Sequence, residues 1–224
     1  MRTAWVVLRK DLRIETRTLE TLPAMILLAL VTFVIFHFGL NRDSISGQEA
    51  AGVLTVALLF SAMLGINRLF VAEREQGGFD AFLLAPVDRS AMMVAKAAGL
   101  FIYLTLLEVI AVPAFGLFLL GPSLGRPLPG LVLVLVLTNI AFATIGTLVS
   151  GIAVNTRARD LIGPMVGLPL LVPALIGTAR SLGPLLAAGH ATASPPLKWL
   201  AILALYDLVF ALLAYSLFDF LLEE

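Results

Sequence analysis

The sequence predicts an all-α integral membrane protein of six transmembrane helices, preceded by an amphipathic helix at the membrane interface. Three observations predict this fold class: 60% of the 224 residues are hydrophobic, only 13% are charged, and the mean hydropathy is +1.02. A soluble domain of this length typically carries about 25% charged residues, which cover its surface. With half that charge the chain needs lipid, not water, around its surface.

Six apolar segments are long enough to cross a bilayer, because a spanning helix needs roughly 20 residues for about 30 Å of hydrocarbon. They cover residues 22–40, 50–70, 94–120, 129–154, 161–179 and 199–222. Aliphatic runs of this length indicate helices, since the strands of an outer-membrane barrel would alternate apolar and polar residues over about 10 positions. The loops between them are short, so we expect one transmembrane domain over residues 1–224.

Residues 1–21 precede the first span and have the pattern of an amphipathic helix. Its apolar face and its basic face hold four residues each: Trp5, Leu8, Leu12 and Leu19 on one, Arg2, Arg9, Arg13 and Arg17 on the other. A basic amphipathic helix with an aromatic residue at its edge lies in the membrane interface. A charged flank that only fixes topology is the alternative. The long basic region argues against a cleavable signal peptide.

The distribution of Lys and Arg predicts that both termini are cytoplasmic. With the N-terminus inside, the inner segments carry eleven of the 15 basic residues and the outer loops carry the other four: Arg42, Arg126, Arg180 and Lys198. Cytoplasmic loops carry the excess of basic residues in membrane proteins. An even number of spans agrees with this orientation.

The largest inner loop, residues 71–93, combines a charged cluster with a short apolar helix. Gly77 and Gly78 break the chain, Phe79, Phe82 and Leu83 then share one helical face, and Pro86 ends the helix. Aromatic side chains exposed on the cytoplasmic side need a surface that buries them. The membrane surface or the protein's own helices would serve, and so would a groove on a partner protein.

This loop resembles the hallmark of ABC-2 type permeases, which is E-R-E-x-G, an apolar pair, P-V-x-R and a Lys that opens the third span. The resemblance implies a coupling helix that docks on a separate nucleotide-binding subunit. It makes the following residues the coupling candidates: Arg74, Glu75, Gly77, Phe79, Phe82, Leu83, Pro86 and Arg89.

A second stretch is similar to the haem exporter protein B (CcmB) family, the membrane subunit of the cytochrome c maturation ABC transporter. Its most distinctive part is L-P-L-x-V-P-x-L-I, with Pro169 and Pro173 four residues apart, and the run L-F-S-A-M-L-G-I-N-R-L-F of the second span also resembles the family. The likeness covers nearly the whole chain. It implies an inner-membrane permease of bacteria that works with two ATPase subunits, a second copy of itself and a haem-handling membrane subunit.

The chain lacks the motifs that would make it an enzyme or an ATP-binding protein. No G-x-x-x-x-G-K-[ST] occurs, so ATP must be bound by another subunit. Cysteine is absent, which excludes disulfides, thiolate metal sites and cysteine nucleophiles. The net charge is zero and gives no argument for nucleic-acid binding. We expect no metal and no cofactor on this chain, with haem confined to the wider complex.

Four residues inside the spans invite functional interpretations. Glu108 and Asp207 are buried charges that need partners; for Glu108 an interhelical polar anchor is favoured over a proton relay or a substrate contact. Pro169 and Pro173 interrupt the fifth span, either as breaks in a mobile, pathway-lining helix or as static kinks.

The two histidines, His37 and His190, both fall on the outer side and have the chemistry of haem axial ligands. Two histidines in a chain of this length need no such explanation, and a haem contact is the less favoured interpretation.

Three other functions remain open. The first is an ABC-2 exporter of a lipid, a polysaccharide or a drug, which would copurify with an ATPase alone. The second is an ion-coupled secondary carrier that uses Glu108 and Asp207 and needs no ATPase. Many carriers are built from internal repeats, and the repeat symmetry of this sequence is weak, which counts against the carrier. The third is a structural subunit that only assembles others and would tolerate changes in the coupling loop.

Overall fold

The computed structural model describes residues 2–40, 42, 44–70, 89–120, 128–154, 159–187 and 194–221. These residues form the following helices: α1 (Arg2–Thr18), α2 (Thr21–Leu40), α3 (Gly47–Arg68), α6 (Arg89–Phe115), α7 (Leu128–Val154), α8 (Arg159–Leu185) and α9 (Leu197–Leu221). A five-residue π-helical segment, η1 (Gly116–Leu120), continues α6. The predicted all-helical class is confirmed for the part of the chain that the structure describes.

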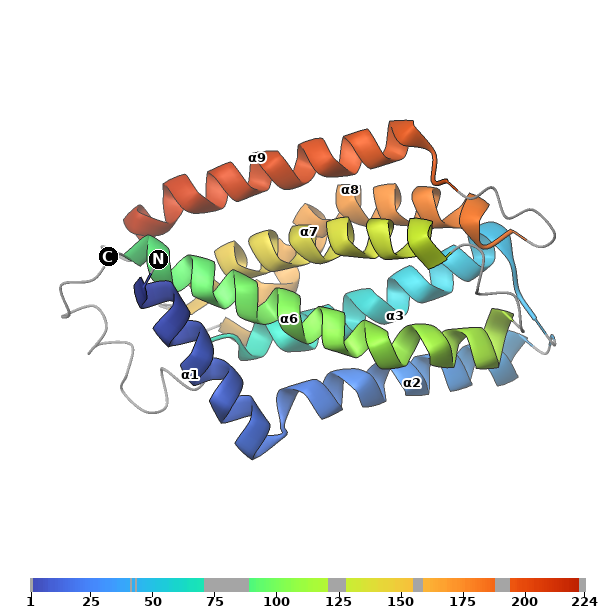
Figure 1. Ribbon diagram of the computed structural model, residues 1–224, viewed down its shortest axis with the longest axis horizontal. Helices are drawn as coiled ribbons and strands as arrows, with labels where there is room; N and C mark the ends of the chain where they lie inside the picture. Colours follow the sequence, from blue (N-terminus) through green and yellow to red (C-terminus); the bar gives the residue numbers. More distant parts are fainter. Residues whose placement is uncertain are drawn as a thin grey trace.

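Six helices are long and apolar enough to cross a membrane, which agrees with the predicted number of spans. They are Thr21–Leu40, Gly47–Arg68, Ser90–Leu120, Leu128–Ala153, Gly163–Leu185 and Leu197–Leu217. The six helices lie side by side along the long axis of the molecule, and α1 crosses one end of them obliquely (Figure 1). The start of α1, the end of α3, the start of α6 and the end of α9 all lie at this end, which we call the α1 end.

The helices α3 and α7 form the centre of the bundle. In the apolar stretch of each of these two helices, 67% of the residues are buried. In α2 and in α9 the share is 17%, so these two helices lie at the periphery. Phenylalanine and leucine side chains fill the space between the helices of the bundle. Fully buried examples are Phe33, Phe115, Phe142, Leu54 and Leu104.

The two central helices are in close contact near the α1 end. A Cβ atom on Gly146 of α7 would lie 2.5 Å from Cγ1 of Ile66 on α3, so only glycine fits there without displacing Ile66. One turn further along α7, the Ser150 hydroxyl donates to the Ile66 carbonyl over 2.8 Å. The end of α3 is therefore fixed where the chain enters residues 71–88.

The proline-rich α8 is one continuous helix. It contains Pro164, Pro169, Pro173 and Pro184, and it continues past the expected end of the span at residue 179 to Leu185. Each proline removes one backbone hydrogen bond. Neighbouring helices can compensate such losses in a membrane. Pro169 and Pro173 thus lie within one continuous helix, and their role as static kinks or as breaks in a mobile, pathway-lining helix stays a prediction.

The interfacial helix α1 differs from its predicted pattern at Trp5 and at Leu19. Leu8 and Leu12 are half-buried, but Trp5 is 63% exposed and Leu19 is 61% exposed. Leu19 does not share the apolar face because the helix ends at Thr18, and Leu19 itself adopts a left-handed backbone conformation with φ of 50°. The prediction that Leu19 continues this face was therefore wrong.

Candidate functional site

The predicted coupling residues lie mostly outside the described part of the chain. Arg74, Glu75, Gly77, Phe79, Phe82, Leu83 and Pro86 fall in residues 71–88, and Arg89 is described only as the first residue of α6. The structure does describe the two segments that flank this loop, the end of α3 and the start of α6. Both lie at the α1 end of the bundle (Figure 1). They meet α1 in a polar contact region that we call the junction, defined by Asp11, Glu15, Arg68, Phe70 and Lys96.

A buried ion pair forms the centre of the junction. The Lys96 ammonium of α6 lies 2.9 Å from the Asp11 carboxylate of α1, with side-chain exposures of only 4% and 13%. Lys10 reaches the other oxygen of the same carboxylate over 3.2 Å. Lys96 also lies over the ring of Phe70, 5.4 Å from its centre. Lys96 therefore joins α1 to the last described residue before the predicted coupling loop.

A second acid of α1 ties this helix to α2. The buried Glu15 carboxylate accepts hydrogen bonds from the backbone N–H groups of Thr21 and Leu22, over 2.9 and 2.7 Å. These are the donors that a helix N-terminus leaves without an intrahelical partner. An exposed pair between Arg68 of α3 and Glu20, at 3.5 Å, closes the same region. The starts of α2 and α6 are thus connected to α1, and the end of α3 is connected to the link between α1 and α2.

One feature of the sequence indicates this junction and was not interpreted in the sequence analysis. Asp11 and Glu15 are one helical turn apart and fall on the same side of α1 as Leu8 and Leu12, which is the side that packs on the bundle. An acid on a packed face needs a partner. The partner Lys96, 85 residues away in the chain, could not be identified from spacing.

Glu108 and Asn139 form an interhelical polar contact in the middle of the bundle. The buried Asn139 amide of α7 donates to the Glu108 carboxylate of α6 over 2.9 Å, and the second oxygen of Glu108 is buried with no hydrogen-bond partner among the described residues. Nearby in α7, the Thr138 hydroxyl shares a hydrogen bond of 2.8 Å with Thr178 of α8. Sequence reasoning did not single out Asn139, whose signal is a lone amide in an uncharged span.

Asp207 of α9 is buried, and neither of its carboxylate oxygens has a hydrogen-bond partner among the described residues. Its neighbour Tyr206 donates to the Leu170 carbonyl of α8 instead. No hydrogen bond in the described part of the chain joins Asp207 to Glu108. The two acids that a carrier would use are therefore placed separately, on α9 and α6.

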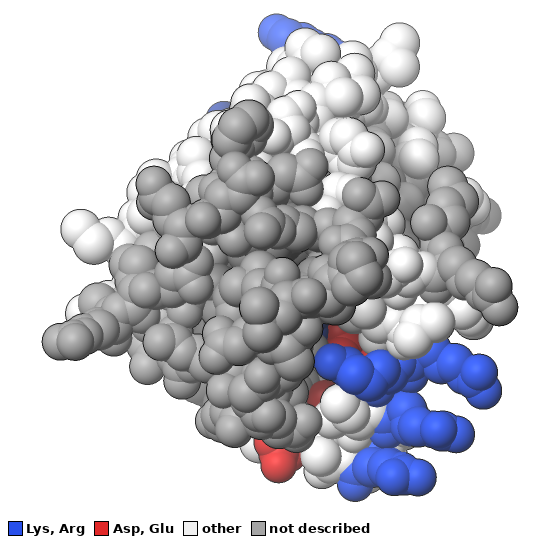
Figure 2. Space-filling view, turned by 90° about the vertical axis from the view of Figure 1, so that its left-hand side faces the viewer, with Lys and Arg blue, Asp and Glu red and all other residues white. Residues whose placement is uncertain are grey.

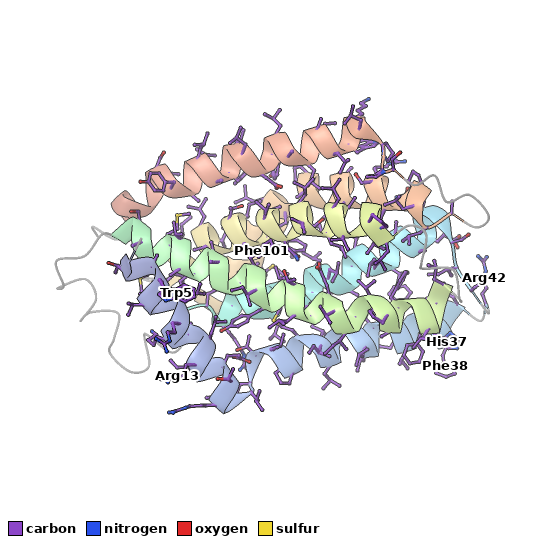
Figure 3. All side chains as sticks on the ribbon, viewed as in Figure 1. Trp5, Arg13, His37, Phe38, Arg42 and Phe101 are labelled. Carbon is purple, nitrogen blue, oxygen red and sulfur yellow. The ribbon has the colours of Figure 1, made fainter. Side chains whose placement is uncertain are left out.

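His37 lies at the opposite end of the molecule from the junction, near Phe38 and Arg42 (Figure 3). Its ring meets the rings of Phe38 and Phe118, with centres 5.1 and 6.2 Å apart. His190 falls outside the described residues. No group of three or more His, Cys, Asp or Glu that could hold a metal ion occurs among the described residues.

These features define a multi-pass helical membrane protein with an amphipathic helix attached to the ends of its spans. The family model described as CcmB protein matches residues 2–219. Heme exporter protein B of Paracoccus denitrificans is 29% identical over 176 residues, which are 78% of this chain and 80% of that protein. Heme exporter protein B of Bradyrhizobium diazoefficiens is 26% identical over 206 residues, 91% and 90% of the two chains. The chain therefore belongs to the CcmB family, and the resemblance found in the sequence is confirmed.

Proposed function

We propose that the chain is the permease subunit of an ABC transporter complex that serves haem export or delivery for the maturation of c-type cytochromes. The observation that carries this proposal is the family match over residues 2–219, together with relatives that bear the name heme exporter protein B. ATP hydrolysis takes place in a separate ATPase, present in two copies, and a second copy of this chain completes the membrane part. Haem is handled by a further membrane subunit, from which the complex releases a haem-loaded chaperone.

In this proposal the α1 end faces the cytoplasm of a bacterial inner membrane. The support is the charge distribution, because the segments expected at this end carry eleven of the 15 basic residues. The loop of residues 71–88 then lies on the cytoplasmic side, where an ATPase can reach it.

The junction provides a path by which movement of that loop would reach the helices. A pull on the chain acts first on Phe70 and on the start of α6, and Lys96 contacts Phe70 on one side and Asp11 on the other. Through α1 and Glu15 the displacement reaches the N-terminus of α2. Because packed elements move as units rather than deform, we expect α1, α2 and α6 to shift together when the ATPase closes.

Affinity purification of the full chain from native membranes in mild detergent tests the proposal. We expect an ATPase and a haem-handling membrane subunit to copurify with the chain. Phe82→Asp should leave the protein inserted in the membrane and remove the ATPase, because a charge on the docking face carries a desolvation cost. Leu197→Asp is the matched control, since Leu197 is 80% exposed and begins α9 at the other end of the bundle.

Retention of the ATPase at normal stoichiometry by the Phe82→Asp variant would refute this placement of the coupling helix. Copurification of an ATPase without any haem-handling subunit would favour an exporter of another substrate.

A further inference from the structure

The two faces of α1 carry opposite charge. Both acids of this helix, Asp11 and Glu15, lie on the side that packs against the bundle, where each has partners. The cations Arg9, Arg13 and Arg17 are exposed on the other side. They are four residues apart, so they form a row along the helix with roughly 6 Å between neighbours. No ion pair or hydrogen bond of their side chains occurs among the described residues.

The exposed face of α1 also offers apolar surface and a hollow. Trp5 and Val6 are 63% and 61% exposed, and with the three arginines they line an open groove of about 390 Å³. Figure 2, which views the molecule from the α1 end, shows the basic side chains gathered on one side and pointing away from the bundle. Trp5 and Arg13 lie along the same helix at this end (Figure 3). The surface thus combines positive charge with an exposed aromatic residue.

The length of α2 sets the depth of this surface in the membrane. The helix α2 has 20 residues from Thr21 to Leu40, and a helix of this length spans about 30 Å, the thickness of the hydrocarbon layer. Arg17 precedes Thr21 by four residues, so it lies at the level of the lipid headgroups. The outward faces of α2 are apolar and exposed, at Leu27, Val31 and Ile35 among others, and these face lipid chains.

From these observations we propose that Arg9, Arg13 and Arg17 form a binding site for the phosphate groups of anionic phospholipids, with Trp5 and Val6 against the start of the acyl chains. Guanidinium groups bind phosphate oxygens with two parallel hydrogen bonds. Basic pockets beside transmembrane helices on the cytoplasmic side recognise anionic headgroups. The arginines extend away from the side of the bundle, where lipid surrounds the helices, and not along its long axis, where a protein docked at the α1 end would lie (Figure 2). This direction favours lipid as the binding partner. This inference concerns the lipid contact of α1 and stands independently of the proposed transport function.

The experiment measures bound lipid on the full chain and needs no ATPase. Protein reconstituted in vesicles of phosphatidylcholine with a minor share of phosphatidylglycerol is extracted in mild detergent, and its bound lipids are identified by native mass spectrometry. We expect phosphatidylglycerol to be enriched over its share in the vesicles. The triple substitution Arg9→Gln, Arg13→Gln and Arg17→Gln should abolish the enrichment, because each basic residue near an anionic surface contributes roughly a fivefold factor in affinity. The triple Lys variant should keep most of it.

The matched control removes the same charge at the other end, through Arg42→Gln, Arg180→Gln and Lys198→Gln, and should keep the enrichment. The chain has no native cysteine, so labelling of one introduced cysteine verifies that each variant keeps its orientation. Equal phosphatidylglycerol enrichment in the wild type and the triple Gln variant would overturn the proposal. So would a triple Gln variant that keeps its lipid but loses a copurifying ATPase, because the face would then be a protein docking surface.

Discussion

The junction and the middle of the bundle both bury carboxylates, but they surround them differently. In the junction, Asp11 faces Lys96 and Lys10, and Glu15 accepts two backbone hydrogen bonds. In the middle, Glu108 has one amide partner, and Asp207 has no hydrogen-bond partner among the described residues. The junction therefore gives each of its acids either a cation or two backbone donors at the end of the helices, whereas the interior supplies one amide donor or none.

This difference indicates at which positions the stability of the fold depends on polar residues. A buried ion pair contributes little net stability, but removal of one partner leaves an uncompensated charge and is strongly destabilising. A hydrogen bond inside a membrane bundle contributes much less. We therefore expect substitutions of the buried junction residues Asp11, Glu15 and Lys96 to disturb the fold more than substitutions of the intramembrane acids, although the latter lie deeper in the membrane.

The largest effect is expected for Lys96→Met, which leaves the Asp11 carboxylate beside α6 without its closest cation. Breaking a buried pair in this way costs about 3–5 kcal/mol. The measurement is the unfolding free energy of the purified protein in detergent, by chemical denaturation. The double variant Lys96→Met with Asp11→Leu should recover most of the loss, because no buried charge is left unpaired and Lys10, which also loses its contact with Asp11, is 47% exposed.

Arg68→Gln is the matched control for this prediction. Its partner Glu20 is 68% exposed, and Arg68 is 42% exposed. Exposed pairs contribute at most about 1 kcal/mol. If Lys96→Met is as mild as Arg68→Gln, the junction is not a rigid link, and the path proposed from residues 71–88 to α1 loses its basis.

The sequence predicted the parts of this structure that depend on composition and on local spacing. The six spans follow from apolar length, and the exposed cations of α1 follow from helical periodicity. The end of α1 at Thr18 and the position of Leu19 beyond it did not follow, because no glycine or proline marks that boundary. The pairs Lys96–Asp11 and Asn139–Glu108 join residues 85 and 31 positions apart. Such contacts depend on which helices become neighbours, and a single sequence does not encode this in its local pattern.

A smaller effect is expected from Asn139→Leu in the middle of the bundle. This substitution removes the amide partner of Glu108, and single hydrogen bonds between membrane helices average about 0.6 kcal/mol, with a maximum near 1.7. Glu108→Gln can keep a hydrogen bond with Asn139 and should have a still weaker effect. The same denaturation measurement ranks both variants below Lys96→Met. A loss from Asn139→Leu equal to that of Lys96→Met would contradict the distinction between the two regions.

The smallest effect on folding is expected from Asp207→Leu. Neither carboxylate oxygen of Asp207 has a hydrogen-bond partner among the described residues, so the substitution breaks no hydrogen bond there. A leucine of similar size removes a buried polar group, and replacement of an unsatisfied polar group by an apolar one is close to neutral or stabilising. We expect an unfolding free energy equal to or slightly above that of the wild type. The Tyr206 hydrogen bond to Leu170 holds α9 against α8 in both proteins.

Under the proposed function, formation of c-type cytochromes in cells that carry each variant then separates structure from function at Asp207. If Asp207 only fills space on α9, Asp207→Leu supports normal cytochrome formation, and so does Glu108→Gln. If both variants fold normally but fail in cells, the two acids act in the transport step, as an ion-coupled carrier requires. Failure of Asp207→Leu alone would instead assign Asp207 a contact made only in the assembled complex.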